Sequence, residues 1–274
     1  MKKATKMGLA IVAYAAIACR GEDRLPPPRS VAPEGDRHAF RWDFSKAGTR
    51  SYAFSQTMSN RSLLRSSEHT ARAEASGFVD IVSSGDGKAK LVLRDIELRP
   101  DGSQQPHSMP TVVIPDVRED GSVAGIGDPR SALMALLMPL PPKPLAIGEV
   151  QELPLQVPVN AQGSPLTLQG TAKVRLTGFA QVDGQRCGVL SAVIDISKLE
   201  VPKELSGSYQ ASIKGTATVH FDPLQHSLVR TEVAIVMSMK TAIPEGDGST
   251  ERMEMVSDNL MKLSSQKVAP RPIP

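Results

Sequence analysis

The sequence has only two cysteines, Cys19 and Cys187. A network of disulfide bonds and a zinc site built from several thiolates are therefore excluded. The five histidines share none of the spacings of metal-binding pairs; they are His38, His69, His107, His220 and His226. We predict no bound metal, and we expect Cys187, which precedes an apolar run, to be a small buried side chain.

The motifs of common enzymes are also missing. There is no G-x-S-x-G sequence, and no Ser-x-x-Lys sequence opens a helix. The glycine pairs in Gly85–Gly87 and Gly125–Gly127 lack the third glycine of a nucleotide-binding loop. The sequence thus predicts a protein that is not an enzyme and needs no cofactor.

Blocks of basic residues are absent beyond the N-terminus. The formal net charge of +3 equals the contribution of Lys2, Lys3 and Lys6, so the rest of the chain is neutral. Binding to nucleic acid requires a positive surface, so we exclude nucleic acid as a partner. Electrostatic attraction to anionic lipids is not expected either.

The apolar run near the N-terminus is short. Met7–Ala18 has twelve residues, too few for a permanent transmembrane helix and typical of the core of a signal peptide. Lysines precede it, and the small residues of Ala16–Ala18 stand directly before Cys19. This pattern predicts cleavage after residue 18, which would remove 18 of the 274 residues.

Met1–Cys19 resembles the start of a bacterial lipoprotein precursor, although Ala16 stands where leucine is more usual. The resemblance implies cleavage before Cys19, covalent lipid on that cysteine and a membrane anchor in the bacterial cell envelope. Arg20 is not the aspartate that retains some lipoproteins in the inner membrane, so we expect the outer membrane, facing the periplasm. The alternative is an ordinary cleaved signal peptide with an incidental cysteine.

Composition divides the chain into four parts. Residues 19–37 are polar and rich in proline, as in a stiff tether. A β-rich pattern follows and ends before a loose tail. The predicted organisation is a signal peptide at 1–18, a tether at 19–37, one β-rich domain at 38–266 with possible halves 38–138 and 148–266, and a tail at 267–274.

Apolar and polar residues alternate through most of the domain. Phe40, Trp42 and Phe44 begin this pattern, and Tyr209–Phe221 is its most regular stretch. Turn signals such as Asp183-Gly184 separate the alternating segments. We predict a mainly β fold: a curved antiparallel sheet or open half-barrel of about ten strands. Val189–Ile196 is apolar on both faces and is expected to be covered on both sides.

One segment predicts a helix. Asp128 fits an N-cap and Pro129 the first helical position. Ser131–Met138 is apolar almost all round, so it is expected to form a short helix buried against the sheet. The proline run at Pro141–Pro144 should follow as a rigid, extended crossing.

Three segments of the second half resemble uncharacterised bacterial lipoproteins: LPPKPLAIGE, GQRCGVLSAVIDI and GTATVHFDPLQHSLVRTEV. The resemblance implies a turn that enters a strand, a hairpin that holds Cys187, and two strands joined by an FDP turn. A curved sheet around an apolar helix is also similar in architecture to periplasmic lipoprotein carriers, which hold acyl chains. Likeness of architecture is a weak argument for function.

Four methionines flank the turn around Gly246. If the hairpin is centred there, Met237 faces Met255 and Met239 faces Met253, all on one side of the sheet. They could form an adaptable core patch, a wall for a hydrophobic ligand together with Met134 and Met138 of the helix, or a thioether site for Cu(I).

We expect a lipid-anchored, non-catalytic envelope protein that binds a hydrophobic ligand or a protein partner. Two alternatives stay open. The first is a structural or assembly lipoprotein without a ligand, and the second is a Cu(I) binder that uses the methionines. An apolar cavity beside Ser131–Met138 would favour the ligand hypothesis.

Overall fold

The computed structural model describes residues 29–31, 37–64, 67–103, 105–123, 136–161, 164–201, 208–244 and 250–266. Among these residues no helix is long and apolar enough to span a membrane. Residues 1–28 lie outside the described part, so the predicted signal peptide and the predicted lipid attachment at Cys19 lie outside it too.

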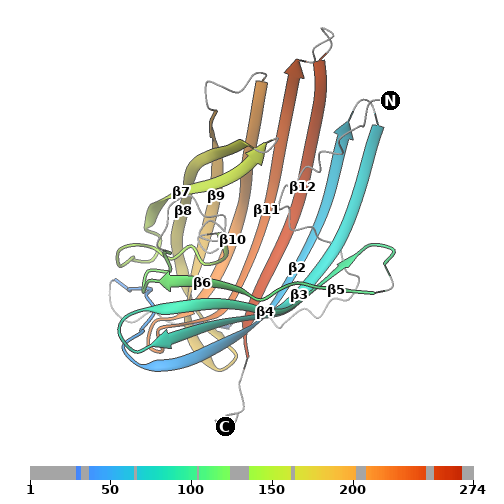
Figure 1. The fold of residues 1–274 in the computed structure, drawn as a ribbon. Helices are drawn as coiled ribbons and strands as arrows, with labels where there is room; N and C mark the ends of the chain where they lie inside the picture. Colours follow the sequence, from blue (N-terminus) through green and yellow to red (C-terminus); the bar gives the residue numbers. More distant parts are fainter. Residues whose placement is uncertain are drawn as a thin grey trace.

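In the described part of the chain, twelve antiparallel strands form one sheet that curves without closing (Figure 1). The strands are β1 (Arg29–Val31), β2 (Ala47–Leu64), β3 (Ser67–Ser84), β4 (Ala89–Pro100), β5 (His107–Ser108), β6 (Val112–Val117), β7 (Val150–Ala161), β8 (Ser164–Val182), β9 (Gln185–Glu200), β10 (Ser208–Asp222), β11 (Ser227–Pro244) and β12 (Thr250–Ser265). The predicted mainly β class and the curved, open antiparallel sheet are confirmed.

Strands from both ends of the domain meet in the middle of the sheet. The order is β1-β8-β9-β10-β11-β12-β2-β3-β4-β5, with β6 on β4 and β7 on β8. β12 pairs with β2 from Met253 and Leu64 to Ser265 and Tyr52. The two predicted halves therefore contribute to one sheet, and both also contribute to its main hydrophobic core.

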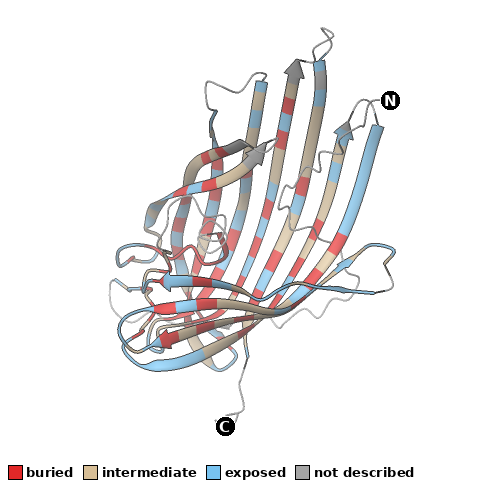
Figure 2. Cartoon of the chain, in the orientation of Figure 1, coloured by how far each residue is buried: buried red, intermediate tan, exposed pale blue. Residues whose placement is uncertain are grey.

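The side of the sheet that carries this core is called the inner face, and the opposite side the outer face. Alternation along each strand separates them: Ile213, Ala217 and Val219 of β10 are buried on the inner face, whereas Lys214 and Thr218 point outward and are exposed. Figure 2 shows buried positions gathered where the curled ends of β2 and β3 face β8–β10, and fewer of them along the upper part of β3.

An extended segment fills this core instead of forming a strand. His38–Phe44, called the aromatic strap, buries Phe40, Trp42 and Phe44. The ring centroid of Trp42 lies 5.5 Å from that of Phe221 and 6.3 Å from that of Tyr52. Apolar and polar residues do alternate along the strap. The reason is that an extended segment lies over the inner face, and it does not pair as a strand of the sheet.

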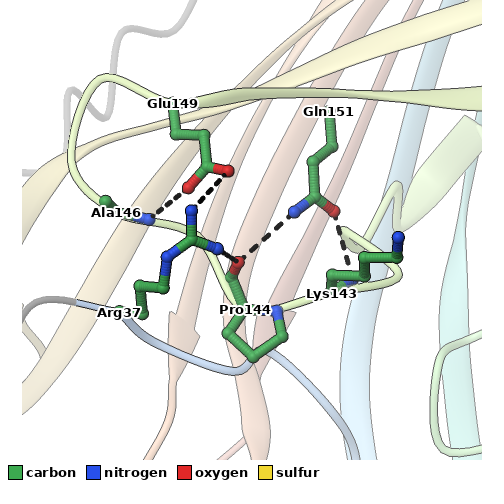
Figure 3. Close-up of polar contacts among 6 residues, drawn as sticks. All are labelled: Arg37, Lys143, Pro144, Ala146, Glu149 and Gln151. Carbon is green, nitrogen blue, oxygen red and sulfur yellow. Dashed lines mark hydrogen bonds and ion pairs between the residues drawn. The ribbon is translucent and has the colours of Figure 1, made fainter.

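The proline crossing, Pro139–Leu145, lies beside the start of the strap; it is not the extended run that was predicted for Pro141–Pro144, because the backbone bends at Pro142 and Lys143. Leu145 and His38 exchange two backbone hydrogen bonds of 2.9 Å. Arg37 donates to the carbonyl oxygen of Pro144 at 3.2 Å and to Glu149 Oε1 at 2.9 Å (Figure 3). These bonds hold the start of the domain against the crossing.

Glu149 also closes the turn before β7. Its Oε2 accepts the backbone N–H of Ala146 at 2.9 Å (Figure 3). These contacts with Ala146 and Arg37 lower the pKa of the Glu149 carboxyl. Gln151 completes the group, because its side chain accepts from the backbone N–H of Lys143 and donates to the carbonyl of Pro144. The LPPKPLAIGE segment is thus a turn entering a strand, as expected.

Three expectations need correction or completion. Val193 of β9 is 58% exposed, so the second face of the Val189–Ile196 stretch is not covered along its whole length; on that face, Val189 packs against a small second cluster that includes Cys187. Arg29–Val31, inside the predicted tether, pairs with β8 as β1. The short buried helix is not shown: residues 131–135 lie outside the described part, and only Leu136 and Leu137 have helical backbone.

Candidate functional site

Four methionines gather on the inner face beyond the packed core. Met237 and Met239 belong to β11, and Met253 and Met255 to β12. Together they are called the methionine patch. All four share the inner face because their positions have the same parity as the buried core residues Val233 and Met261 of the two strands.

The observed register differs from the predicted one by two residues. Met239 lies opposite Met255, while Met237 lies opposite Ser257 and Met253 opposite Thr241. The two strands meet at Pro244 and Thr250, so the hairpin is centred on residue 247 and not on Gly246. A shift of two keeps each side chain on its face, but it leaves one directly facing methionine pair where two were predicted.

The patch is partly buried. Met239 is 7% exposed, and Met237, Met253 and Met255 are half-buried. On the other side of β11, Met237 lies opposite Ile213 of β10, and Met237 packs against the main core. The patch therefore continues the apolar surface of the core toward the far ends of β11 and β12.

A strip of uncharged polar side chains borders the patch on the β2 side. Gln56 Nε2 donates to Asn259 Oδ1 at 3.4 Å, and Asn259 Nδ2 donates to Ser257 Oγ at 2.9 Å. Asn60 lies opposite Ser257. Sequence reasoning missed this strip, although each of these residues interrupts the alternation at an inward position.

Four charged residues of these strands point to the outer face. Lys240 pairs with Glu254 at 2.7 Å, and Lys262 pairs with Glu232 at 3.2 Å. Four described stretches of β2, β10, β11 and β12 have no Asp, Glu, Lys or Arg at their inward positions. These stretches are Gln56–Ser62, Tyr209–Ala217, Val233–Thr241 and Met253–Met261. The inner surface formed by these stretches is therefore uncharged.

The remaining predicted methionines do not join the patch in the described structure. Met138 is 2% exposed and belongs to the main core near Leu140. It acts as core packing and not as a ligand wall. Met134 lies outside the described residues, as does the part of the predicted helix that carries it.

Two hollows are present elsewhere. A cavity of about 30 Å³ lies between Phe54 and Met109, with an apolar lining. A groove of about 840 Å³ lies on the outer side, where Lys214, Val236 and Leu260 lie along one side and Glu97 and Arg99 along another. Neither hollow is lined by the methionine patch.

Cys187 is a buried free thiol, as predicted. Burial and the nearby carboxylates of Asp222 and Asp183 raise its pKa to about 12, so the thiol stays protonated and unreactive at neutral pH. Burial and the charge of Arg230 lower the pKa of His220 to about 4. Within the described residues, no group of three or more His, Cys, Asp and Glu side chains is placed to hold a metal ion.

Comparison with known proteins gives little further help. No family model matches the chain, and no curated protein matches it. The crystal structure of a DUF1329 family protein from Desulfovibrio piger is similar over 83% of this chain and 89% of that one, with 12% identity and a TM-score of 0.13. A TM-score this low carries no argument about function.

Proposed function

We propose that this chain is a lipid-anchored, non-catalytic protein of the bacterial cell envelope, in the outer membrane facing the periplasm, and that it binds a hydrophobic ligand over the methionine patch. The observation behind the proposal is an uncharged inner surface that continues the core and carries four methionines. Methionine side chains are flexible and polarizable, so they adapt to apolar ligands of different shapes.

The anchor part of the proposal rests on the N-terminal sequence. Cys19 follows a basic segment, an apolar run and small residues. Feeding cells a radiolabelled fatty acid should label the protein, and Cys19→Ser should abolish the label. Label retained in the variant would overturn the anchor.

Binding is tested on the Cys19→Ser chain expressed without its signal segment. The probe is N-phenyl-1-naphthylamine, which fluoresces in apolar surroundings. Met253→Lys and Met255→Lys place a charge at half-buried inner positions, where burying an unpaired ammonium is unfavourable. We expect each to weaken binding at least tenfold. Val236→Lys is the control, because Val236 is exposed on the outer face of β11.

Far-ultraviolet circular dichroism of each variant checks that the sheet is retained. Absence of probe binding by the parent chain would overturn the ligand proposal, as would equal binding by the inner-face and outer-face variants. The assembly and Cu(I) alternatives are tested with the same preparation. A reproducible envelope partner without probe binding would favour assembly, and Cu(I) affinity lost on replacing the four methionines by leucine would favour copper.

A further inference from the structure

Two polar atoms at opposite corners of the methionine patch are buried without a hydrogen-bond partner. They are Asn60 Oδ1 on β2 and Thr241 Oγ1 on β11. Thr241 is 5% exposed and lies opposite Met253, and Asn60 lies opposite Ser257. A buried polar atom without a partner lowers stability, so each such atom in a fold calls for a physical reason.

The two atoms differ in the kind of hydrogen-bond partner that would satisfy them. The Asn60 carbonyl oxygen is an acceptor only, so it can be satisfied only by a donor such as N–H or O–H. A hydroxyl such as that of Thr241 can donate or accept. The neighbours of Asn60 in the polar strip, Asn259 and Ser257, already bond to each other. Asn60 Oδ1 is therefore left as a buried acceptor without a donor, at the border between the polar strip and the apolar patch.

Spacing indicates what could lie between the corners. Asn60 and Thr241 are separated by two strand spacings across β12 and by four residues along the strands. This corresponds to about 16 Å. Met255 lies at the midpoint of that diagonal, with Met253 and Met239 on either side of it. An aliphatic chain laid over the methionines would thus begin next to Asn60 and run toward Thr241.

The absence of charged residues on this surface restricts the class of ligand further. The inward positions of Gln56–Ser62, Tyr209–Ala217, Val233–Thr241 and Met253–Met261 offer no cation for a carboxylate or phosphate and no anion for an amine. Placing a charged group against this surface would remove its water without supplying a counter-ion. An uncharged polar group that donates a hydrogen bond meets both conditions.

From these observations we infer that the ligand class is an uncharged amphiphile with an N–H or O–H donor next to an aliphatic chain, such as an N-acyl amide, with the donor on Asn60 Oδ1 and the chain across Met255 and Met253. The inference deepens the proposed function and rests on it. It separates amides and alcohols from esters, which share the chain but lack the donor.

Three probes of one chain length test it by competition with N-phenyl-1-naphthylamine on the Cys19→Ser chain: N-methylhexadecanamide, methyl hexadecanoate and hexadecanoate. We expect the amide to bind about fivefold to tenfold more tightly than the ester, from one net hydrogen bond, and more tightly than the anion. Asn60→Leu should make the amide and the ester equal. This variant should fold, because it removes a buried unpaired acceptor.

Ser59→Leu is the matched control, since Ser59 is the neighbouring position of β2 on the outer face. It should keep the preference for the amide. Equal binding of amide and ester to the parent chain, tightest binding of the anion, or a preference retained in Asn60→Leu would each overturn the inference alone. Failure of all three probes to bind the parent chain would overturn the proposed function with it.

Discussion

Met239 of β11 lies directly opposite Met255 of β12 on the inner face of the sheet. This pair fixes the register of the hairpin that carries the methionine patch. It also places Met237 and Met253 on the diagonals, next to Ser257 and Thr241. The surface is therefore a mixed row of thioethers and hydroxyls, not two stacked methionine pairs.

The register can be tested with cysteine pairs in a Cys19→Ser, Cys187→Ala background. Side chains directly opposite each other have Cβ atoms about 4.5–5.5 Å apart, whereas diagonal neighbours are about 7–8 Å apart. Met239→Cys with Met255→Cys should form a disulfide on mild oxidation, detected by the mass of a cross-linked proteolytic peptide. Met237→Cys with Met255→Cys should not. The reverse result would restore the register centred on Gly246.

The aromatic strap should contribute strongly to stability. Trp42 is almost fully buried, and its ring contacts those of Phe44, Tyr52 and Phe221. We expect Trp42→Ala to lower the free energy of unfolding by about 3–5 kcal/mol in urea titrations. Leu224→Ala, at a site that is 70% exposed, should change it by less than about 0.5 kcal/mol. Similar effects of both changes would contradict the strap's place in the core.

Gly215 of β10 lies too close to β11 for any side chain. A Cβ atom built there would lie 2.1 Å from the carbonyl oxygen of Ala234 and 2.8 Å from Ile235 Cα. Both are backbone atoms, so relief requires the strands to move apart, and we expect Gly215→Ala to lower the free energy of unfolding by about 1–3 kcal/mol. Gly48→Ala is the control, since no atom lies within 4 Å of its added Cβ. An unfolding midpoint for Gly215→Ala that matches that of the control would contradict this close approach.

His220 should make the fold sensitive to acid. Its pKa falls from 6.5 to about 4 because the ring is buried and lies opposite Arg230 in β11. The unfolded chain takes up this proton below about pH 6.5, whereas the folded chain resists until about pH 4. The free energy of unfolding should therefore decrease as pH falls through this window, by about 3 kcal/mol at most.

Urea titrations between pH 7 and pH 4 measure this loss. His220→Gln removes the titrating ring, so the free energy of unfolding of this variant should fall less between about pH 6.5 and pH 4. His107→Gln serves as the control, because His107 is exposed, and it should leave the curve unchanged. A parent curve unaffected by His220→Gln would show that another group causes the acid sensitivity.

Local signals in the sequence predicted the elements that depend on neighbouring residues. The regular alternation of Tyr209–Phe221 lies within β10. The Asp183-Gly184 turn joins β8 to β9, with positive φ angles of 51° and 83° at the two residues. Both features are encoded within a few residues, because side-chain period and turn geometry are local properties.

Features that depend on distant partners could not be predicted. Nothing in the sequence near Tyr52–Leu64 indicates that β2 lies beside β12, at the other end of the chain. Phe40, Trp42 and Phe44 have the same alternation as a strand, because an extended segment lying on a core also buries every second residue. The exposure of Val193 likewise depends on what covers the outer face.

The candidate site was predicted in part. Parity along two strands placed the four methionines on one face, which holds for any register that differs by an even number. The facing pairs were wrong because the hairpin is centred one residue further along the chain. The polar strip of Asn60, Ser257 and Asn259 combines two strands that are remote in sequence, so it becomes visible only when β12 and β2 are paired.

The aromatic strap also determines how a pull on the N-terminus reaches the domain. Force transmitted along the chain meets the short pairing of β1 with β8 first, then the bonds of Arg37 to Glu149 and Pro144, and then the two backbone bonds between His38 and Leu145. Next in line are the buried rings of Phe40, Trp42 and Phe44. Beyond β1 the chain is thus clamped in the interior before its first long strand begins, so tension at the N-terminus would act on the centre of the fold once β1 has separated from β8.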